Sequence, residues 1–169
     1  MKATTFNFGK LVALGLLAGS TFVATAATGP FKMALPENGP AADAIKAGQY
    51  QQAVIELNNS ATDLFSKQIS LCVAHTQLSQ FALAEKACSQ AIVTARRLEG
   101  ETSSNKREMR ALAFSNRGVT RLLMQDPVAA LEDFEQAQSL SSTEYGQYNL
   151  SLLQQKLKAA VAPVLTAAN

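Results

Sequence analysis

The chain has 169 residues, of which 47% are hydrophobic and 7% aromatic, with no tryptophan. This length suits one ordinary domain, and the abundance of alanine favours closely packed helices over a sheet. The formal net charge is +2, but Lys2 and Lys10 lie in a segment that we expect to be removed, which leaves 13 of the 15 basic residues against 13 acidic ones. A neutral mature chain gives no electrostatic reason for a nucleic-acid partner.

The first 26 residues have the pattern of a secretory signal peptide. Lys2 and Lys10 form a positive n-region, an apolar run follows from Leu11 to Val23, and Ala24-Thr25-Ala26 has the small-x-small pattern of a cleavage site. The run is shorter than the roughly 20 residues of a membrane span. We therefore predict a periplasmic or secreted protein, cleaved near Ala26 and without stable membrane insertion afterwards. An uncleaved N-terminal anchor is the alternative.

Residues 27–40 are predicted to be a linker, because Gly29-Pro30, Pro36 and Asn38-Gly39-Pro40 interrupt any helix. Beyond them the apolar residues recur with a helical period. The predicted helices span 41–47, 50–59, 64–78, 81–98, 107–124, 128–140 and 144–161. The Ala-rich residues 162–169 are predicted to form a flexible tail.

Three segments align without gaps around a shared alanine. They are Gly48-Gln-Tyr50-Gln-Gln-Ala53-x3-Leu57, Ser79-Gln-Phe81-Ala-Leu-Ala84-x3-Cys88 and Gln125-Asp-Pro127-Val-Ala-Ala130-x3-Phe134. An alanine at a fixed place lets two antiparallel helices approach closely, and the larger residue four positions later fills the space beside it. The alignment therefore predicts a repeated helix hairpin.

These segments resemble the second helix of the tetratricopeptide repeat, whose period is about 34 residues. The stretch Ala113-Phe-Ser-Asn-Arg-Gly118 is similar to the family's first helix, with Gly118 at its small position. The resemblance spans roughly residues 41–160 and implies an all-α stack of antiparallel helix hairpins. Its expected parts are a truncated unit, two fuller units and a C-terminal capping helix, over 41–62, 64–98, 107–140 and 144–161.

In the family that these repeats resemble, the first helices line a concave groove that binds a segment of another protein. The resemblance places Asn116 on this face, pointing toward a partner and not into the core. In one subgroup such an Asn holds a peptide carboxylate, but the Lys and Arg that this requires are replaced here, for example by Ile69 and Leu150. The expected groove residues are Ser70, Val73, Gln77, Leu112, Ser115, Asn116, Val119 and Asn149. Their mixed apolar and amide lining suits an uncharged helix or an extended peptide.

Cys72 and Cys88 are the two cysteines of the chain and fall at inward positions of two antiparallel helices. In an oxidising compartment two facing cysteines can form a disulfide, which for a short loop is worth about 3 kcal/mol. The alternative is that both are small apolar core residues. Their spacing excludes a C-x-x-C redox motif.

The sequence presents no catalytic constellation. His75 is the single histidine and has no ligand-type neighbours at suitable spacing, so we expect no metal and no cofactor. Arg110, Arg117 and Arg121 form a basic stripe that is typical of solvated ion pairs, or of a surface for an acidic partner. The prediction is a non-catalytic scaffold for protein–protein interaction. The alternatives are a self-assembling structural envelope protein and an enzyme of unrecognised type.

Overall fold

The computed structural model describes residues 30–36, 39 and 41–166, so the predicted signal peptide lies outside the described residues. Across the described part of the chain all regular secondary structure is helical, which confirms the predicted all-α class. The helices are α1 (Ala42–Lys46), α2 (Tyr50–Asn59), α3 (Leu64–Gln77), α4 (Phe81–Arg97), α5 (Ser103–Leu123), α6 (Pro127–Leu140) and α7 (Glu144–Thr166).

Two helix bounds differ from the prediction by several residues. Helix α5 begins at Ser103 instead of 107, because the Thr102 side chain caps it by accepting a hydrogen bond from the N–H of Asn105 at 3.1 Å. Helix α7 continues to Thr166, so residues 162–166 of the predicted tail are helical.

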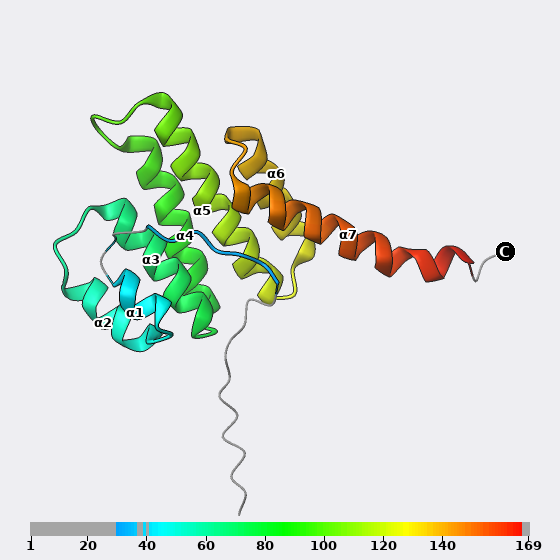
Figure 1. Ribbon diagram of the computed structural model, residues 1–169, viewed down its shortest axis with the longest axis horizontal. Helices are drawn as coiled ribbons and strands as arrows, with labels where there is room; N and C mark the ends of the chain where they lie inside the picture. The colour runs from blue at the N-terminus through cyan, green and yellow to red at the C-terminus, as the bar shows by residue number, and fades with distance from the viewer. Residues whose placement is uncertain (1–29, 37–38, 40, 167–169) are drawn as a thin grey trace, which may run out of the picture.

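Consecutive helices pack side by side as antiparallel hairpins from α2 to α6 (Figure 1). Helix α7 packs on α5 and α6 through its first half, and its C-terminal half extends away from the stack (Figure 1). The odd-numbered helices also contact one another, α1 with α3, α3 with α5 and α5 with α7. They therefore form one continuous face of the stack.

The three aligned segments begin with the same backbone turn. Gly48, Ser79 and Gln125, the first residue of each segment, all have positive φ, at 75°, 57° and 63°. In each case the next residue donates a backbone hydrogen bond to the carbonyl five residues earlier, as in Gln80 N–H to His75 O at 2.9 Å. This left-handed ending closes each first helix with a Schellman-type cap. The sequence alignment thus corresponds to a repeated local structure.

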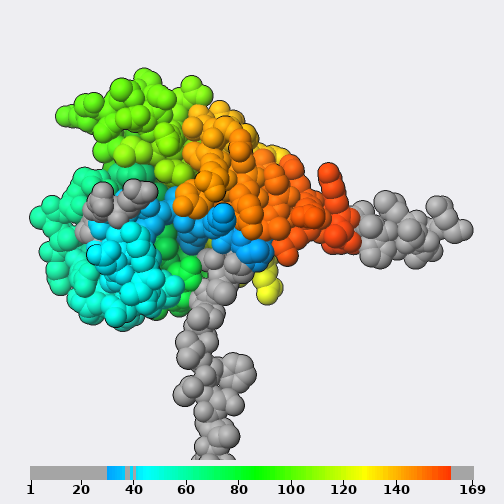
Figure 2. Space-filling view, viewed as in Figure 1, coloured from blue at the N-terminus to red at the C-terminus, as the bar shows by residue number. Residues whose placement is uncertain are grey.

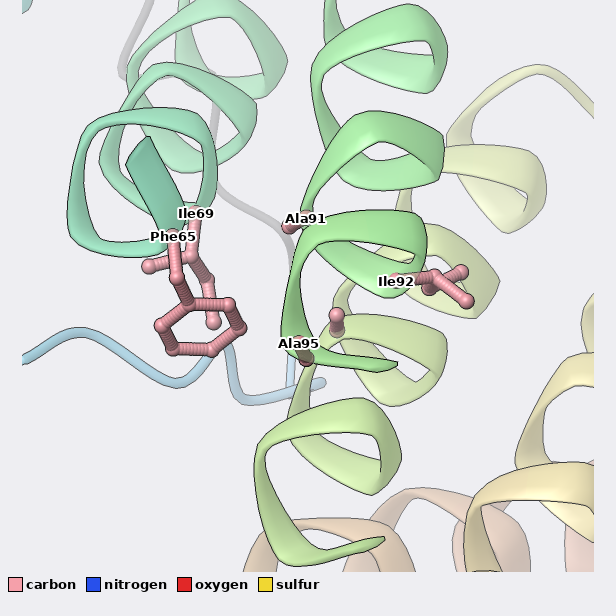
Figure 3. Close-up of a cluster of buried hydrophobic side chains, with 6 residues drawn as sticks. Phe65, Ile69, Ala91, Ile92 and Ala95 are labelled. Atoms are coloured by element: carbon pink, nitrogen blue, oxygen red, sulfur yellow. The ribbon is translucent and has the colours of Figure 1, made fainter. Parts of the chain in front are cut away.

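The aligned alanines lie in the core between packed helices. Ala53, Ala84 and Ala130 are fully buried, and so is the Phe134 ring. A Cβ atom placed on Gly118 of α5 would lie 2.5 Å from Cε1 of Phe134 in α6. A similar small-to-large fit joins α3 to α4, where Phe65 and Ile69 point toward Ala91 and Ala95 (Figure 3).

Covalent and ionic links fix the middle helices. The sulfurs of Cys72 in α3 and Cys88 in α4 form a disulfide, with the Cα atoms 5.0 Å apart. Arg117 of α5 donates to both carboxylate oxygens of Asp133 in α6, at 2.7 and 2.9 Å. Arg121 pairs with Asp133 at 3.0 Å and with Glu85 of α4 at 2.9 Å. These two arginines of the basic stripe therefore bind neighbouring helices.

Candidate peptide-binding groove

Residues Phe31–Leu35, here named the N-terminal segment, lie extended across the face formed by the odd-numbered helices. The segment is the blue trace that crosses in front of the stack in Figure 1. In the space-filling view it runs between α7, in orange, and the α1–α2 pair, in cyan (Figure 2). This face, here named the groove, thus already holds an extended segment of the chain itself.

Two asparagine side chains hold the backbone of this segment in the same way. The N–H of Ala34 donates to Oδ1 of Asn116 at 2.7 Å, and Nδ2 of Asn116 donates to the carbonyl of Ala34 at 2.8 Å. Asn149 makes the equivalent pair with Lys32, at 2.9 and 2.7 Å. In an extended chain, alternate residues present their N–H and C=O to the same edge. The two amides therefore recognise backbone geometry and not side-chain identity.

Burial makes these amide contacts obligatory. Asn116 and Asn149 are each 0% exposed, and a buried amide left without partners costs about 1–3 kcal/mol. Nδ2 of Asn149 also donates to Oγ of Ser115 at 3.1 Å, which fixes the orientation of the amide. The groove floor is therefore polar at two fixed points.

Between those points the groove is apolar. The ring of Phe31 stacks on Phe134, with the centroids 6.3 Å apart and the planes 13° from parallel. Met33 packs against the same cluster as Phe31 and also against the cluster that contains Val73, where Leu35 lies. Apolar residues at every second position match the two-residue period of an extended chain.

The other side of the segment faces α7. Nζ of Lys32 lies 4.6 Å from the ring centroid of Tyr148 and 3.8 Å from a carboxylate oxygen of Glu144. Exposed contacts of this kind contribute about 1 kcal/mol or less each. They orient Lys32 along α7 without burying its charge.

Five of the eight expected groove residues lie around or beneath the N-terminal segment. Ser115, Asn116 and Asn149 meet around the backbone of the segment. Val73 and Val119 belong to the apolar clusters beneath it.

The remaining residues lie beside or away from the segment. Leu112 lines a cavity next to Ala34. Ser70 is fully buried and its hydroxyl has no hydrogen-bond partner among the described residues, while Gln77 is half-buried in the last turn of α3. A larger cavity, of about 480 Å³, opens on α3 and α4 and contains none of the expected groove residues.

That the N-terminal segment of the chain itself lies in the groove was not predicted from the sequence. The sequence predicts an open face with Asn116 turned toward a partner, and a linker over residues 27–40. In the structure Asn116 is fully buried and is hydrogen-bonded to the backbone of Ala34 in that stretch. The signal that was missed is the apolar character of the segment, in which four of the five residues Phe31–Leu35 are apolar.

No protein-family model, curated protein or solved structure matches this chain. Within the part of the chain that the structure describes, no helix is long and apolar enough to cross a membrane, and no three His, Cys, Asp or Glu side chains gather as a metal site.

Proposed function

We propose that this chain is a non-catalytic scaffold of the tetratricopeptide type that binds an extended segment of a partner protein in its concave groove. The observation that carries the proposal is the paired contact of Asn116 and Asn149 with the backbone of alternate residues. Side-chain amides that satisfy both the N–H and the C=O of a residue give affinity for any extended chain in the correct register.

The apolar part of the groove adds selectivity to this backbone recognition. The positions of Phe31, Met33 and Leu35 each contact buried clusters, so an extended ligand needs apolar side chains at every second residue. Full burial of such a side chain is worth about 1.5–3 kcal/mol, and partial burial, as for Phe31, Met33 and Leu35, is worth correspondingly less. The proposed partner is therefore an uncharged, extended protein segment and not a nucleic acid or a small substrate.

We further propose that the protein acts after export to the periplasm, since residues 1–26 have the pattern of a signal peptide. A disulfide between Cys72 and Cys88 fits an oxidising compartment. Mass spectrometry of protein from the periplasmic fraction is expected to give the intact mass of a chain that begins near Ala27. A full-length mass found in the membrane fraction would contradict the proposal.

Photo-crosslinking in the living cell tests whether a partner protein binds at the groove. A photoreactive residue in place of Tyr145, which is 38% exposed beside the groove, is expected to capture one distinct protein, identified by its peptides. The matched control is Val128, which is 69% exposed at the start of α6, and should not capture it. Equal capture from both positions would reject the groove as the binding surface. Crosslinks only to a second copy of the chain would favour self-assembly instead.

A further inference from the structure

The cavity of about 480 Å³ on α3 and α4 is a second candidate site, separate from the groove. It shares no lining residue with the cavity next to Ala34. Its lining comes from the first two turns of α3 and from α4, namely Leu64, Gln68, Lys86, Ser89, Gln90, Val93, Thr94 and Arg97. Because the described residues that line it belong to these two helices alone, the side away from them is open.

The α4 residues of this lining form one stripe along the helix. Positions 86, 89, 90, 93, 94 and 97 are three or four residues apart, which is the spacing of a single helix face. The stripe spans eleven residues, so it is about 16 Å long, or three turns. In its middle Val93 is 48% exposed, and Leu64 of α3 is 55% exposed. Exposed apolar side chains along three turns are typical of a contact face for another helix.

Both ends of the stripe carry a positive charge without a partner. Lys86 and Arg97 are exposed, and neither forms an ion pair with another described residue. Glu85 is the one acidic residue within α3 and α4, and it is bound to Arg121 at 2.9 Å. Asp63 precedes α3 and caps its first turn. The cavity thus presents two cations around an apolar centre, with no acidic residue in its lining.

We propose that this surface is a second docking site, which binds an acidic amphipathic helix of a partner protein. The partner helix places apolar side chains on Leu64 and Val93, and carboxylates about three turns apart beside Lys86 and Arg97. Opposite charges at the two ends set the register of one helix on the other. This site goes beyond the proposed function, because the groove recognises an extended backbone and this surface recognises a helix.

The charges of α6 and α7 argue against a second copy of this chain as the occupant. The half of α7 that extends away from the stack contains Lys156 and Lys158 and no acidic residue, so like charges oppose its docking. Glu132 and Glu135 are exposed on α6, but they lie three residues apart, whereas the two cations of the stripe lie eleven residues apart. Charge complementarity therefore favours a different protein.

Binding of a designed helix to the mature full chain tests the inference. The probe is the fluorescent peptide Ala-Gln-Glu-Ala-Ala-Gln-Leu-Ala-Gln-Leu-Leu-Ala-Gln-Glu-Ala-Ala, stapled on the face away from its leucines so that it stays helical. The comparison peptide has lysine in place of both glutamates. We expect the glutamate peptide to bind at least about tenfold more tightly in anisotropy, since two attractive charge pairs replace two repulsive ones. Equal affinities, or no binding of the glutamate peptide, would overturn the inference.

Reversal of both charges tests the same surface from the side of the protein. The double variant Lys86→Glu with Arg97→Glu should bind the lysine peptide more tightly than the glutamate peptide. Both side chains are exposed, so its melting temperature should change by less than about 3 °C. The control Lys156→Glu with Lys158→Glu makes the same change in net charge on α7 and should keep the wild-type preference.

Two results with these proteins would overturn the inference. One is a charge-reversed variant that still prefers the glutamate peptide, because the peptide would then bind elsewhere. The other is a native dimer that the glutamate peptide converts to monomers, because the surface would then belong to a second copy of the chain.

Discussion

Replacement of both Asn116 and Asn149 by alanine is expected to lower the free energy of unfolding by about 3 kcal/mol. The two side chains make four hydrogen bonds to the backbone of Lys32 and Ala34, and each buried polar group left unpaired costs about 1–3 kcal/mol. Once one of the two asparagines is replaced, the free energy needed to release the N-terminal segment falls below the free energy lost by leaving its backbone groups unpaired. The double variant should therefore lose less than the sum of the two single variants.

Denaturant unfolding of the single and double variants provides the measurement. The matched control is Asn105→Ala, an exposed asparagine on the same helix as Asn116, which should change the unfolding free energy by less than about 0.5 kcal/mol. If the double variant is as stable as this control, the amide contacts do not hold the segment.

The second large effect is expected for Gly118→Ala, which should destabilise the fold by about 2 kcal/mol. An added Cβ would lie 2.5 Å from Cε1 and 2.7 Å from Cδ1 of Phe134, whose side chain is fully buried. Overpacking of this kind costs about 1–3 kcal/mol, and at such short distances it exceeds the gain of up to about 1 kcal/mol in helix propensity.

A double-mutant cycle with Phe134→Leu separates the clash from other causes. The smaller leucine should relieve the contact, so that Gly118→Ala costs much less in that background than in the wild type. If Gly118→Ala lowers the free energy of unfolding equally in both backgrounds, α5 and α6 do not approach as closely at Gly118 as the structure shows.

The helical stack follows closely from residues that are readable in the sequence. Ala53, Ala84 and Ala130 mark the helix contacts because only a small side chain permits that approach, and all three are fully buried. The start of α5 was misplaced because Ser103, Ser104 and Asn105 are frequent in turns, yet Thr102 caps them into a helix. Such residues are compatible with a turn or with the start of a helix, and the Thr102 cap favours the helix.

The contact of the N-terminal segment with the groove was harder to predict from the sequence. The resemblance placed Asn116 and Asn149 on the concave face, but the residues that contact them are 82 and 117 positions away in the chain. Such long-range pairing has no local signature, and the prolines around Phe31–Leu35 suggest a linker. The cavity beside Ala34 depends on three separate helices and is visible only in the folded chain.

Hydrogen exchange at the backbone amides of the native protein tests the central claim most directly. The N–H groups of Lys32 and Ala34 are bonded to buried asparagines, so both should exchange at least about 100-fold more slowly than in an unstructured chain, as an opening free energy near 3 kcal/mol predicts. Met33, whose N–H points to the opposite edge of the extended segment, should exchange faster than either. Exchange of Ala34 at the rate of an unstructured chain would show that the segment does not lie in the groove.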